Sequence, residues 1–387
     1  MSEAAATHFR RAVRLHPRRG TPVGVDLQPV PWSPAGRFTP DAVDPGGLLA
    51  YHTGCVYPQD AASQVPVLLL APQPGETVID ICAAPGSKST QIGLALGDDG
   101  LLVCCDASPQ RRSILAENLA RQGVACALVT PLPVHRLAER SPGCADAVLV
   151  DAPCSGHAEK SERQVARMAE RQGELLALAA KLVRPGGRLV YSTCTVYRGE
   201  NEGVIATFLA AHPAWRVMPR SLPGCDADLD GLGGIRLGPE RQATEPFFAI
   251  ALQRDDSGAE SSLVGQTPDR ETVPWLPAAH AWRRGSTLFL GSPQVASCAL
   301  PTEARGLIIA HGERVEPWGA QALIERGAAA LAVTHEQALA LWAGSDLPAA
   351  VPGGSFLRTD SGMPLGIVDG AGLRLAMPSR LRRSALV

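Results

Sequence analysis

The chain has 387 residues, of which 45% are hydrophobic, and a formal net charge of −2. Its length allows two or three domains with ordinary buried cores. The near-neutral charge excludes a uniformly basic surface, so any nucleic-acid contact must come from local clusters of basic residues. No apolar run approaches the roughly 20 residues that cross a bilayer, and the first residues lack the apolar segment of a secretory signal. These features predict a cytoplasmic protein that does not span a membrane.

The ten cysteines contain no closely spaced Cys-x-x-Cys pair, so their spacing indicates neither a zinc site nor a redox motif. No metal site is predicted, and we expect a monomer. Most free cysteines in proteins are small buried hydrophobes. This interpretation is given to Cys82, Cys104, Cys105, Cys126 and Cys144.

In chain order, residues 1–45 are rich in arginine and proline and predict a small irregular or β-containing lead-in. From residue 46 to 254, short apolar runs alternate with helical patterns, which is typical of a doubly wound α/β sheet. The predicted strands are 77–81, 101–105, 125–129, 147–150, 188–192 and, at an edge, 247–252. The predicted helices are 113–122 and 166–182, the second ended by Arg184-Pro-Gly-Gly187.

Residues 255–274 are polar, contain glycine and proline, and predict a linker. Residues 275–387 predict a small α+β or barrel-like domain. Its expected strands are 286–290, 306–310, 355–358 and 365–375, the last with a hairpin turn at Asp369-Gly370. Its expected helices are 319–326 and 335–342.

The first motif places a small-residue turn between a strand and a helix, in Val78-Ile-Asp-Ile-Cys-Ala-Ala-Pro-Gly-Ser-Lys88. Such a turn lets backbone N–H groups approach a ligand closely. The next strand is followed by Asp106, which is placed to accept the two hydroxyls of a ribose. Because GxGxxG is absent, the pattern favours S-adenosylmethionine over a nicotinamide dinucleotide; the alternative is a tight structural turn. The candidate cofactor-binding residues are Cys82, Ala83, Ala84, Pro85, Gly86, Ser87, Lys88, Asp106 and Asp151.

Two further motifs place cysteines at the ends of predicted strands. Cys154 follows one strand in Asp151-Ala-Pro-Cys154, and Cys194 follows another in Ser192-Thr-Cys-Thr195. Open α/β sheets bind ligands at the carboxyl ends of their strands, so the two thiols could face one pocket. Amino-group methyltransferases usually carry an acid, Asn or Ser followed by Pro-Pro-aromatic at the first position. A cysteine there favours chemistry at carbon, with simple packing as the alternative for each thiol.

These motifs, together with Glu200-Asn-Glu202, resemble the signature set of the Sun/NSUN family of RNA (cytosine-C5) methyltransferases. The chain is most similar to the bacterial RsmF-type enzymes, which methylate 16S ribosomal RNA. The resemblance implies a Rossmann-like class I methyltransferase domain over 46–254, with an RNA-binding lead-in before it and a PUA-like RNA-binding domain over 275–387. Further counterparts are Arg10-Arg-Ala-Val-Arg14, Pro29-Val-Pro-Trp32, Tyr57-Pro-Gln-Asp-Ala-Ala-Ser63, Pro246-Phe-Phe248, Gly362-Met-Pro-Leu-Gly366 and 373–383.

The resemblance also implies a mechanism, in which a thiolate adds to C6 of cytosine so that C5 attacks the methyl sulfonium. It assigns the nucleophile to Cys194 and release of the adduct to Cys154. Asp151 would lie near the methyl donor and the base, and Asp106 would hold the ribose. Lys88 would contact the cofactor or the active-site residues, the alternative being an ion pair with a surface acid. The target base must be unpaired or flipped. RNA contacts are expected from Arg10, Arg11, Arg14, Arg380, Arg382 and Arg383, with solvated surface charge as the alternative.

The sequence departs from the family pattern, and two of these departures bear on the cofactor and substrate sites. The family usually has an Asp after the third strand that contacts the adenine, whereas here Ala127-Leu-Val-Thr130 runs into prolines without an acid. The adenine must therefore be held in another way. The segment after Gly156 is also short, since 157–160 lead almost directly to Arg171-Gln172. That segment helps to shape the substrate pocket, so the choice of RNA stays open.

The leading hypothesis is an S-adenosylmethionine-dependent methyltransferase acting on 16S ribosomal RNA or the small ribosomal subunit. One alternative keeps the chemistry and changes the substrate to tRNA. Another is a ribosome-assembly factor that binds RNA without methylating it, against which the retention of Cys154 and Cys194 argues. A third is DNA methylation with Cys154 as nucleophile, which would leave Ser192-Thr-Cys-Thr195 unexplained.

Overall fold

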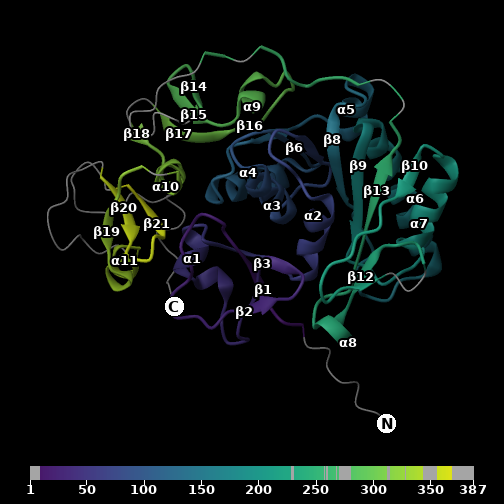
Figure 1. The fold of residues 1–387 in the computed structure, drawn as a ribbon, viewed down its shortest axis with the longest axis horizontal. Coiled ribbons are helices and arrows are strands. Elements are labelled where there is room, and N and C mark those ends of the chain that lie inside the picture. Colours follow the sequence, from purple (N-terminus) through teal and green to yellow (C-terminus); the bar gives the residue numbers. More distant parts are fainter. Residues whose placement is uncertain are drawn as a thin grey trace, which may run out of the picture.

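A mixed sheet of ten strands forms the centre of the protein (Figure 1). The computed structural model describes residues 9–227, 231–256, 258, 260–266, 268–269, 280–311, 314–326, 328–342 and 355–367. Within the sheet, neighbouring strands run parallel in the order β7-β6-β5-β8-β9. These are β5 (Thr77–Asp80), β6 (Leu101–Cys105), β7 (Ala127–Thr130), β8 (Ala145–Asp151) and β9 (Val183–Thr193).

Antiparallel strands extend this sheet on both sides. Beyond β9 lie β13 (Phe247–Arg254), β12 (Ile235–Leu237) and β11 (Asp226–Ala227), and β10 (Trp215–Val217) also pairs with β13. Beyond β7 lies β16 (Ala304–Arg305), which comes from the C-terminal part of the chain. The six strands predicted between residues 46 and 254 are confirmed, with bounds that differ by a few residues. The expected edge position of 247–252 is wrong, because β12 and β10 both pair with β13 on the side away from β9. The contribution of β16 was not expected from the sequence.

Helices cover both faces of the sheet, so the expected doubly wound α/β fold is confirmed (Figure 1). Both predicted helices begin four residues earlier than the apolar pattern indicates, because polar caps precede it. Ser108 Oγ accepts from Arg111 N at the start of one, and Ser161 and Gln164 cap each other's backbone at the start of the other. One group of helices is α2 (Val65–Leu70), α3 (Ser87–Leu96) and α4 (Pro109–Arg121); the other is α5 (Val134–Arg140), α6 (Glu162–Leu182) and α7 (Glu202–Ala211).

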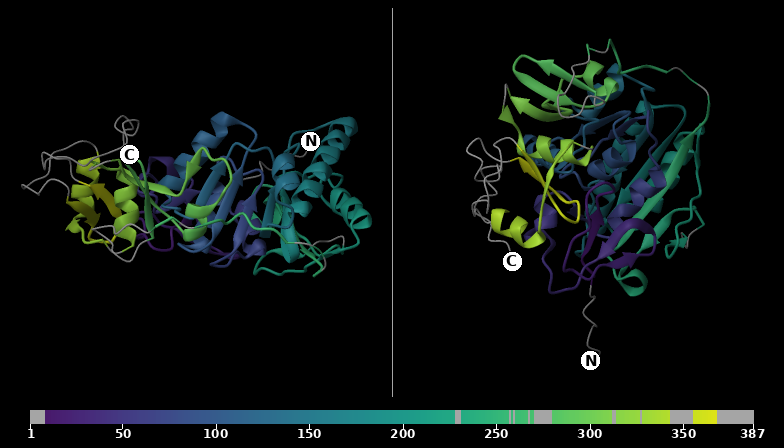
Figure 2. Two further views of the ribbon diagram at one scale, coloured as in Figure 1. Left: turned by 90° about the horizontal axis from the view of Figure 1, so that it is seen from above. Right: turned by 60° about the vertical axis from the view of Figure 1, so that its left-hand side comes forward.

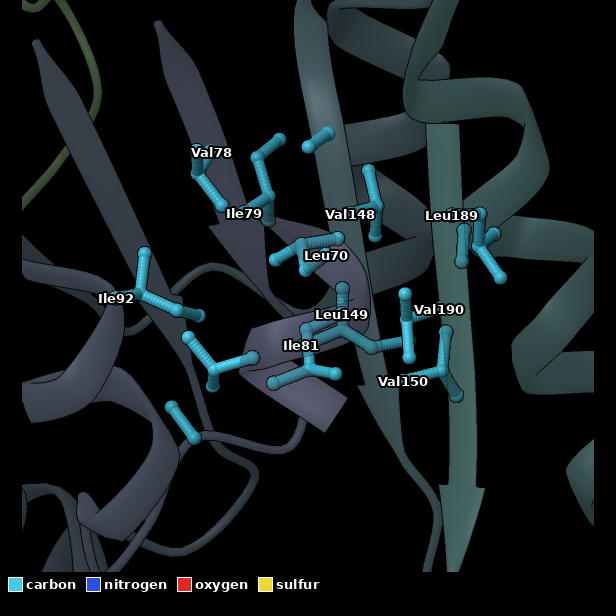
Figure 3. Packing of buried hydrophobic residues seen from close by; sticks show 14 of the residues in the cluster. Leu70, Val78, Ile79, Ile81, Ile92, Val148, Leu149, Val150, Leu189 and Val190 are labelled. Carbon is cyan, nitrogen blue, oxygen red and sulfur yellow. The ribbon is translucent and has the colours of Figure 1, made fainter. Parts of the chain in front are cut away.

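The core of this domain lies between the central strands and the helices on either side (Figure 3). Ile79 of β5, Leu149 of β8 and Leu189 of β9 are fully buried, and Leu70 and Ile92 pack against the sheet from helices α2 and α3. Strands buried on both faces read as continuous apolar runs, which is why the sequence identified them. Burying each such side chain contributes about 1.5–3 kcal/mol.

The N-terminal residues form a separate antiparallel sheet in the order β2-β3-β1-β4. Its strands are β1 (Ala12–Leu15), β2 (Gln28–Val30), β3 (Ser33–Phe38) and β4 (Val56–Pro58), and the short helices η1 (Pro45–Gly47), α1 (Leu49–His52) and η2 (Ala62–Gln64) accompany them. The fourth strand comes after residue 45, so the lead-in continues further than its arginine and proline content indicates. The Trp32 indole donates to Ala61 O at 2.8 Å and fixes this sheet against the following segment.

The C-terminal part contains two small sheets, at the opposite end of the molecule from α6 and α7 (Figures 1 and 2). The first is β14 (Ala281–Arg284), β15 (Thr287–Leu290), β17 (Leu307–His311) and β18 (Arg314–Val315); the second is β19 (Leu331–Val333), β20 (Phe356–Thr359) and β21 (Pro364–Ile367). Helix α10 (Pro317–Glu325) connects the two sheets, α9 (Pro293–Ser297) follows β15, and α11 (His335–Trp342) lies between β19 and β20. Helix α8 (Pro239–Gln242) lies earlier, before β13. The predicted hairpin at Asp369-Gly370 and the strand beyond residue 367 lie outside the described residues.

A buried acid joins the C-terminal part to the N-terminal part. The Glu325 carboxylate at the end of α10 is fully buried and lies 2.8 Å from both the Arg18 and the Arg19 guanidinium groups. His16 Nε2 lies 3.5 Å from the same carboxylate. Burial lowers the pKa of His16 well below its usual range, so the imidazole is neutral at pH 7 and the two arginines balance the charge of Glu325.

In the part of the chain that the structure describes, no helix is long and apolar enough to cross a membrane.

Candidate active site

The turn between β5 and α3 is held against the end of β6. Ala83 N donates to Cys105 O at 2.9 Å, and Ala84 N donates to the Asp106 carboxylate at 3.3 Å. Gly86, the N-cap of α3, has a φ of +113°, and a Cβ there would lie 3.0 Å from a Leu115 methyl group. Only glycine suits this position. The turn therefore brings the positive end of α3 to the carboxyl edge of the sheet, where an open α/β sheet binds its ligand.

Asp106, the expected ribose acceptor, is almost fully buried and orders the loop after β6. One of its oxygens accepts from Ser108 N at 3.0 Å, and the other lies 3.1 Å from the Arg111 guanidinium. Arg111 also donates to Ala84 O. Asp106 thus links the turn after β5 to the loop after β6, at the position where the sequence places the ribose.

A second acid, Asp80 at the end of β5, was not singled out from the sequence. Its carboxylate is fully buried and accepts from Ser89 Oγ at 2.7 Å and from Cys82 N at 3.4 Å. Burial raises the pKa of Asp80 to about 7. The hydrophobic run Val78–Ile81 contains this acid, which is the signal that could have identified it.

Lys88 and Asp151 form an ion pair on two different elements, in which Lys88 is nearly buried and the Asp151 side chain is 31% exposed. Lys88 Nζ at the start of α3 donates to Asp151 Oδ2 at 2.8 Å and to Ser63 Oγ at 3.0 Å. Ser192 Oγ of β9 donates to the other Asp151 oxygen at 2.8 Å. Lys88 therefore pairs with a candidate catalytic acid and not with an acid of the outer surface. With both oxygens bound, the carboxylate is fixed at the end of β8.

The two candidate catalytic cysteines are in direct contact, as expected from the adjacency of β8 and β9. Cys154 Sγ lies 3.1 Å from Cys194 Sγ, and either thiol can donate to the other. This hydrogen bond lowers the pKa of Cys154 to about 7. The same contact raises the pKa of Cys194, an effect reinforced by burial and by the Asp151 charge and opposed by Lys88. The pair therefore shares one proton, and the two shifts place that proton on Cys194 and the thiolate on Cys154 in the resting site. Cys194 has to pass its proton to Cys154 before it can act as a nucleophile.

A buried polar network supports the loop that carries Cys154. Glu200 Oε2 accepts from Ser155 N at 3.0 Å and from Gln172 Nε2 at 2.8 Å, and Gln172 also donates to Pro153 O at 2.8 Å. Tyr191 OH donates to Glu200 O at 2.6 Å. Helix α6, the turn before α7 and strand β9 therefore hold the backbone on both sides of Cys154. The sequence indicated Glu200 and Gln172 as parts of motifs but gave neither a role.

The neighbouring Asn201 does the same for Cys194. Its side chain accepts from Thr193 Oγ1 at 2.5 Å and donates to Thr195 O at 3.1 Å. Because these residues flank Cys194, the thiol sits in a backbone segment fixed on both sides. Each cysteine therefore has its own supporting side chain from the Glu200-Asn-Glu202 motif.

The N-terminal arginines expected to bind RNA differ in position. Arg14 is 3% exposed and donates to Gln59 Oε1, Ser87 O and Thr90 Oγ1 at 2.5–2.8 Å. The Arg14 guanidinium therefore holds the start of α3, and burial lowers the pKa of Arg14 to about 9. Arg10 lies 3.9 Å over the Phe38 ring, and Arg11 is exposed. Arg380, Arg382 and Arg383 lie outside the described residues.

The end of β7, where the sequence lacks the expected acid, is covered by the C-terminal segment. Thr130 Oγ1 donates to Pro301 O at 2.7 Å, and Glu303 N donates to Val129 O at 2.9 Å. Both oxygens of Glu303 accept from Arg112 of α4, at 2.6 and 2.8 Å. An acid more than 170 residues away in sequence therefore lies beside the end of this strand.

All ten cysteines are free thiols. Cys104, Cys105, Cys126 and Cys144 are buried, as the packing interpretation predicts, whereas Cys82 is only partly buried. Among the described residues, no group of three or more His, Cys, Asp or Glu side chains could hold a metal ion.

The parallel sheet, the glycine turn and the strand-end acids together define a Rossmann-like methyltransferase domain. Solved structures from Pyrococcus horikoshii share this fold. A methyltransferase homolog protein is 26% identical, with a TM-score of 0.58 and coverage of 64% of this chain and 87% of that one. NSun6, solved with SFG, is 20% identical, with a TM-score of 0.59 and coverage of 65% and 92%.

The domain can be assigned more closely from sequence. Residues 67–253 match the family described as 16S rRNA methyltransferase RsmB/F. The ribosomal RNA small subunit methyltransferase F of Klebsiella pneumoniae is 34% identical over 69% of this chain and 63% of its own length. The protein of the same name from Citrobacter koseri is 27% identical over 92% of this chain and 84% of its own length. The chain thus matches somewhat under two thirds of the first of these relatives.

Proposed function

We propose that this protein transfers a methyl group from S-adenosylmethionine to C5 of a cytidine in 16S ribosomal RNA. The observation that carries the proposal is the contact between Cys154 and Cys194 beside the Lys88–Asp151 pair. A thiolate is required because C5 of cytosine is a poor nucleophile until C6 carries an added sulfur. Both the sequence family and the names of the relatives in Klebsiella and Citrobacter support ribosomal RNA of the small subunit as substrate.

The turn at 82–88 and Asp106 fit the cofactor, because no side chain caps the N-terminus of α3. The first N–H groups of this helix are therefore available to a ligand at the carboxyl edge of the sheet. When bound, S-adenosylmethionine supplies an electrophilic methyl group on a sulfonium. Cys82, Ala83, Ala84, Pro85, Gly86, Ser87 and Lys88 would hold its methionine end, Asp106 its ribose, and Asp151 would lie near the methyl group.

The chain's own residues then carry the covalent steps. The Cys194 thiolate adds to C6 of the cytosine, and the π electrons of the C5–C6 bond move into the ring. Protonation of N3 beside Asp151 stabilises the negative charge that results. After C5 has gained the methyl group, its hydrogen leaves as a proton, the bond between Cys194 sulfur and C6 breaks, and the C5–C6 double bond re-forms. Cys154 assists this release as the proton acceptor. When Cys194 attacks, the one proton of the pair sits on Cys154 and then passes to N3. Cys154 is therefore a thiolate again when it accepts the C5 proton, and N3 gives up its proton as the adduct breaks.

RNA binding outside the active site is proposed for Arg10, Arg11, Arg380, Arg382 and Arg383, and for a PUA-like C-terminal domain beyond the linker. The two small sheets and their helices support the latter. We further propose that the enzyme acts as a cytoplasmic monomer on RNA or on the small ribosomal subunit. Free thiols at all ten cysteines suit a reducing compartment.

The test uses RNA that contains 5-fluorocytosine, which traps the adduct because its C5 fluorine cannot leave as a proton. The wild-type protein and Cys154→Ala should form a covalent complex with the RNA, and Cys194→Ala should form none. With ordinary RNA, Cys154→Ala should accumulate an adduct that fails to release. The opposite behaviour of the two variants would reverse the assigned roles. Methyl transfer to tRNA in preference to 16S RNA or small subunits would overturn the proposed substrate.

A further inference from the structure

A cavity of about 690 Å³ lies next to the cysteine pair, between the loop after β8 and the first half of α6. Its lining includes Cys154, Lys160, Gln164, Arg167, Met168 and Arg171. We call it the α6 groove. None of the steps proposed above uses a residue of α6, so the groove has no role so far.

The groove presents cations that are not neutralised within the described parts of the chain. Arg167 and Arg171 are exposed and one helical turn apart, so they project from the same side of α6. Neither makes an ion pair or a hydrogen bond among the described residues, whereas Arg112, Arg184 and Arg236 of the same domain are all paired with acids. An unpaired guanidinium at a cavity is well suited to bind phosphate oxygens in a bidentate manner.

Other lining residues favour a nucleotide over a bare anion. Met168 offers an apolar surface against which a base or sugar can pack, while Glu170 and Glu174 add carboxylates to the same lining. Carboxylates repel phosphate but accept hydrogen bonds from the amino groups of bases. The volume lies within the 300–1,000 Å³ typical of sites for small ligands, which suits one or two nucleotides and not a duplex.

The position of the groove determines which nucleotides these are. Cys154 lines it, and its sulfur lies 3.1 Å from that of Cys194. A cytosine must leave its stack for C6 to be attacked, so the nucleotides next to it on the same strand have to pass beside the cysteines. Arg171 also directly precedes Gln172, which holds Pro153 and Glu200. Contacts to RNA on this helix are thus one residue away from the network that positions Cys154.

We propose that the α6 groove binds the single-stranded nucleotides flanking the target cytidine, with Arg167 and Arg171 on their phosphates and Met168 against a base. This inference rests on the proposed function and adds to it a path for the RNA strand. The arginines act as specificity and positioning residues for the substrate and do not touch the reacting atoms.

The test compares two double variants that each remove two exposed positive charges. Arg167→Ala/Arg171→Ala removes two charges from the α6 groove. Arg136→Ala/Arg140→Ala removes two charges from α5, whose residues do not line the groove. Binding of a fluorescent single-stranded 12-nucleotide RNA with one central cytidine is measured by anisotropy at several salt concentrations. The groove variant should bind about tenfold more weakly, and its log–log salt slope should fall by about 1.4, which is about 0.7 for each lost phosphate contact. The control should bind within about twofold of wild type.

Two further measurements separate this proposal from the proposed function. With 16S RNA as substrate, the groove variant should show a higher KM for RNA and an unchanged kcat, while its affinity for S-adenosylmethionine stays at the wild-type value. If no methyl transfer is found but RNA binding depends on the two arginines, the proposed function is wrong while RNA binding by the α6 groove is supported. Equal RNA affinity of both double variants would contradict RNA binding by the α6 groove. If inorganic polyphosphate displaces the labelled RNA as strongly, per charge, as unlabelled RNA does, the groove binds anions in general and the proposal is also contradicted.

Discussion

Cys154 Sγ and Cys194 Sγ lie 3.1 Å apart, at the ends of neighbouring parallel strands. Their hydrogen bond lowers the pKa of Cys154 to about 7, so the thiolate of the pair is lost as the pH falls through this value. We expect kcat/KM to rise about tenfold per pH unit below pH 7 and to level off above it.

The same contact can be tested without RNA. In Cys194→Ala, the hydrogen bond to Cys154 is gone, and the pKa of Cys154 should return toward the usual value for cysteine, about 8.5. Alkylation of Cys154 by iodoacetamide, followed by mass spectrometry between pH 6 and 9, measures this shift. Cys298→Ala, at a buried thiol far from the pair, should leave the profile unchanged. A Cys154 profile that is identical in Cys194→Ala and wild type would contradict the shared proton.

Asp80 predicts a pH dependence of stability. Because burial raises its pKa to about 7, the folded state retains a proton that the unfolded chain loses near pH 4. The free energy of unfolding should therefore fall as the pH rises from 4 to 7, by on the order of 2–4 kcal/mol from this group. Asp80→Asn can still accept from Ser89 and should lack this component. Urea unfolding of both proteins at pH 5 and pH 7.5 gives the comparison, and parallel changes in the two would contradict it.

Gln172 predicts a link between α6 and the rate of methylation. Its side chain holds Pro153 O and the buried Glu200 carboxylate, both at 2.8 Å. Gln172→Ala removes the donor of Pro153 O and leaves Ser155 N as the remaining donor to Glu200 Oε2. The unsatisfied carbonyl should cost about 1–3 kcal/mol of stability. The substitution should also lower kcat, since the Cys154 loop loses support, with little change in KM for RNA. Gln110→Ala, at an exposed glutamine of α4, is the matched control for thermal unfolding and activity.

Glu325 predicts how firmly the C-terminal part is attached. Glu325→Ala leaves Arg19 buried without its partner, and breaking a buried ion pair on one side typically costs about 3–5 kcal/mol. Limited proteolysis should then cut the variant in the C-terminal part faster than wild type. Asp98→Asn neutralises a half-exposed acid that pairs with Arg326 and Arg18, and Arg326 keeps Glu325 nearby. This change should cost less than about 1 kcal/mol. Equal protease sensitivity of the two variants would show that Glu325 does not hold the parts together.

Much of the central domain could be predicted because its strands are covered on both faces, so residues such as Ile79 and Leu149 lie in continuous apolar runs. The meeting of Cys154 and Cys194 followed from the same reasoning, since parallel neighbouring strands end at one edge. The roles of Arg14, Glu303 and Glu325 could not be predicted. Each depends on a partner far away in sequence, and the residue type alone is typical of an exposed surface.

β16 covers the outer edge of β7 with backbone hydrogen bonds. A polypeptide that ended after residue 254 would leave β7 as an open edge strand, and unpaired edges of this kind template the aggregation of one molecule with another. It would also leave the Arg112 guanidinium without Glu303. The C-terminal part therefore closes an edge of the central sheet, and we expect a polypeptide cut after residue 254 to self-associate more readily than the full chain.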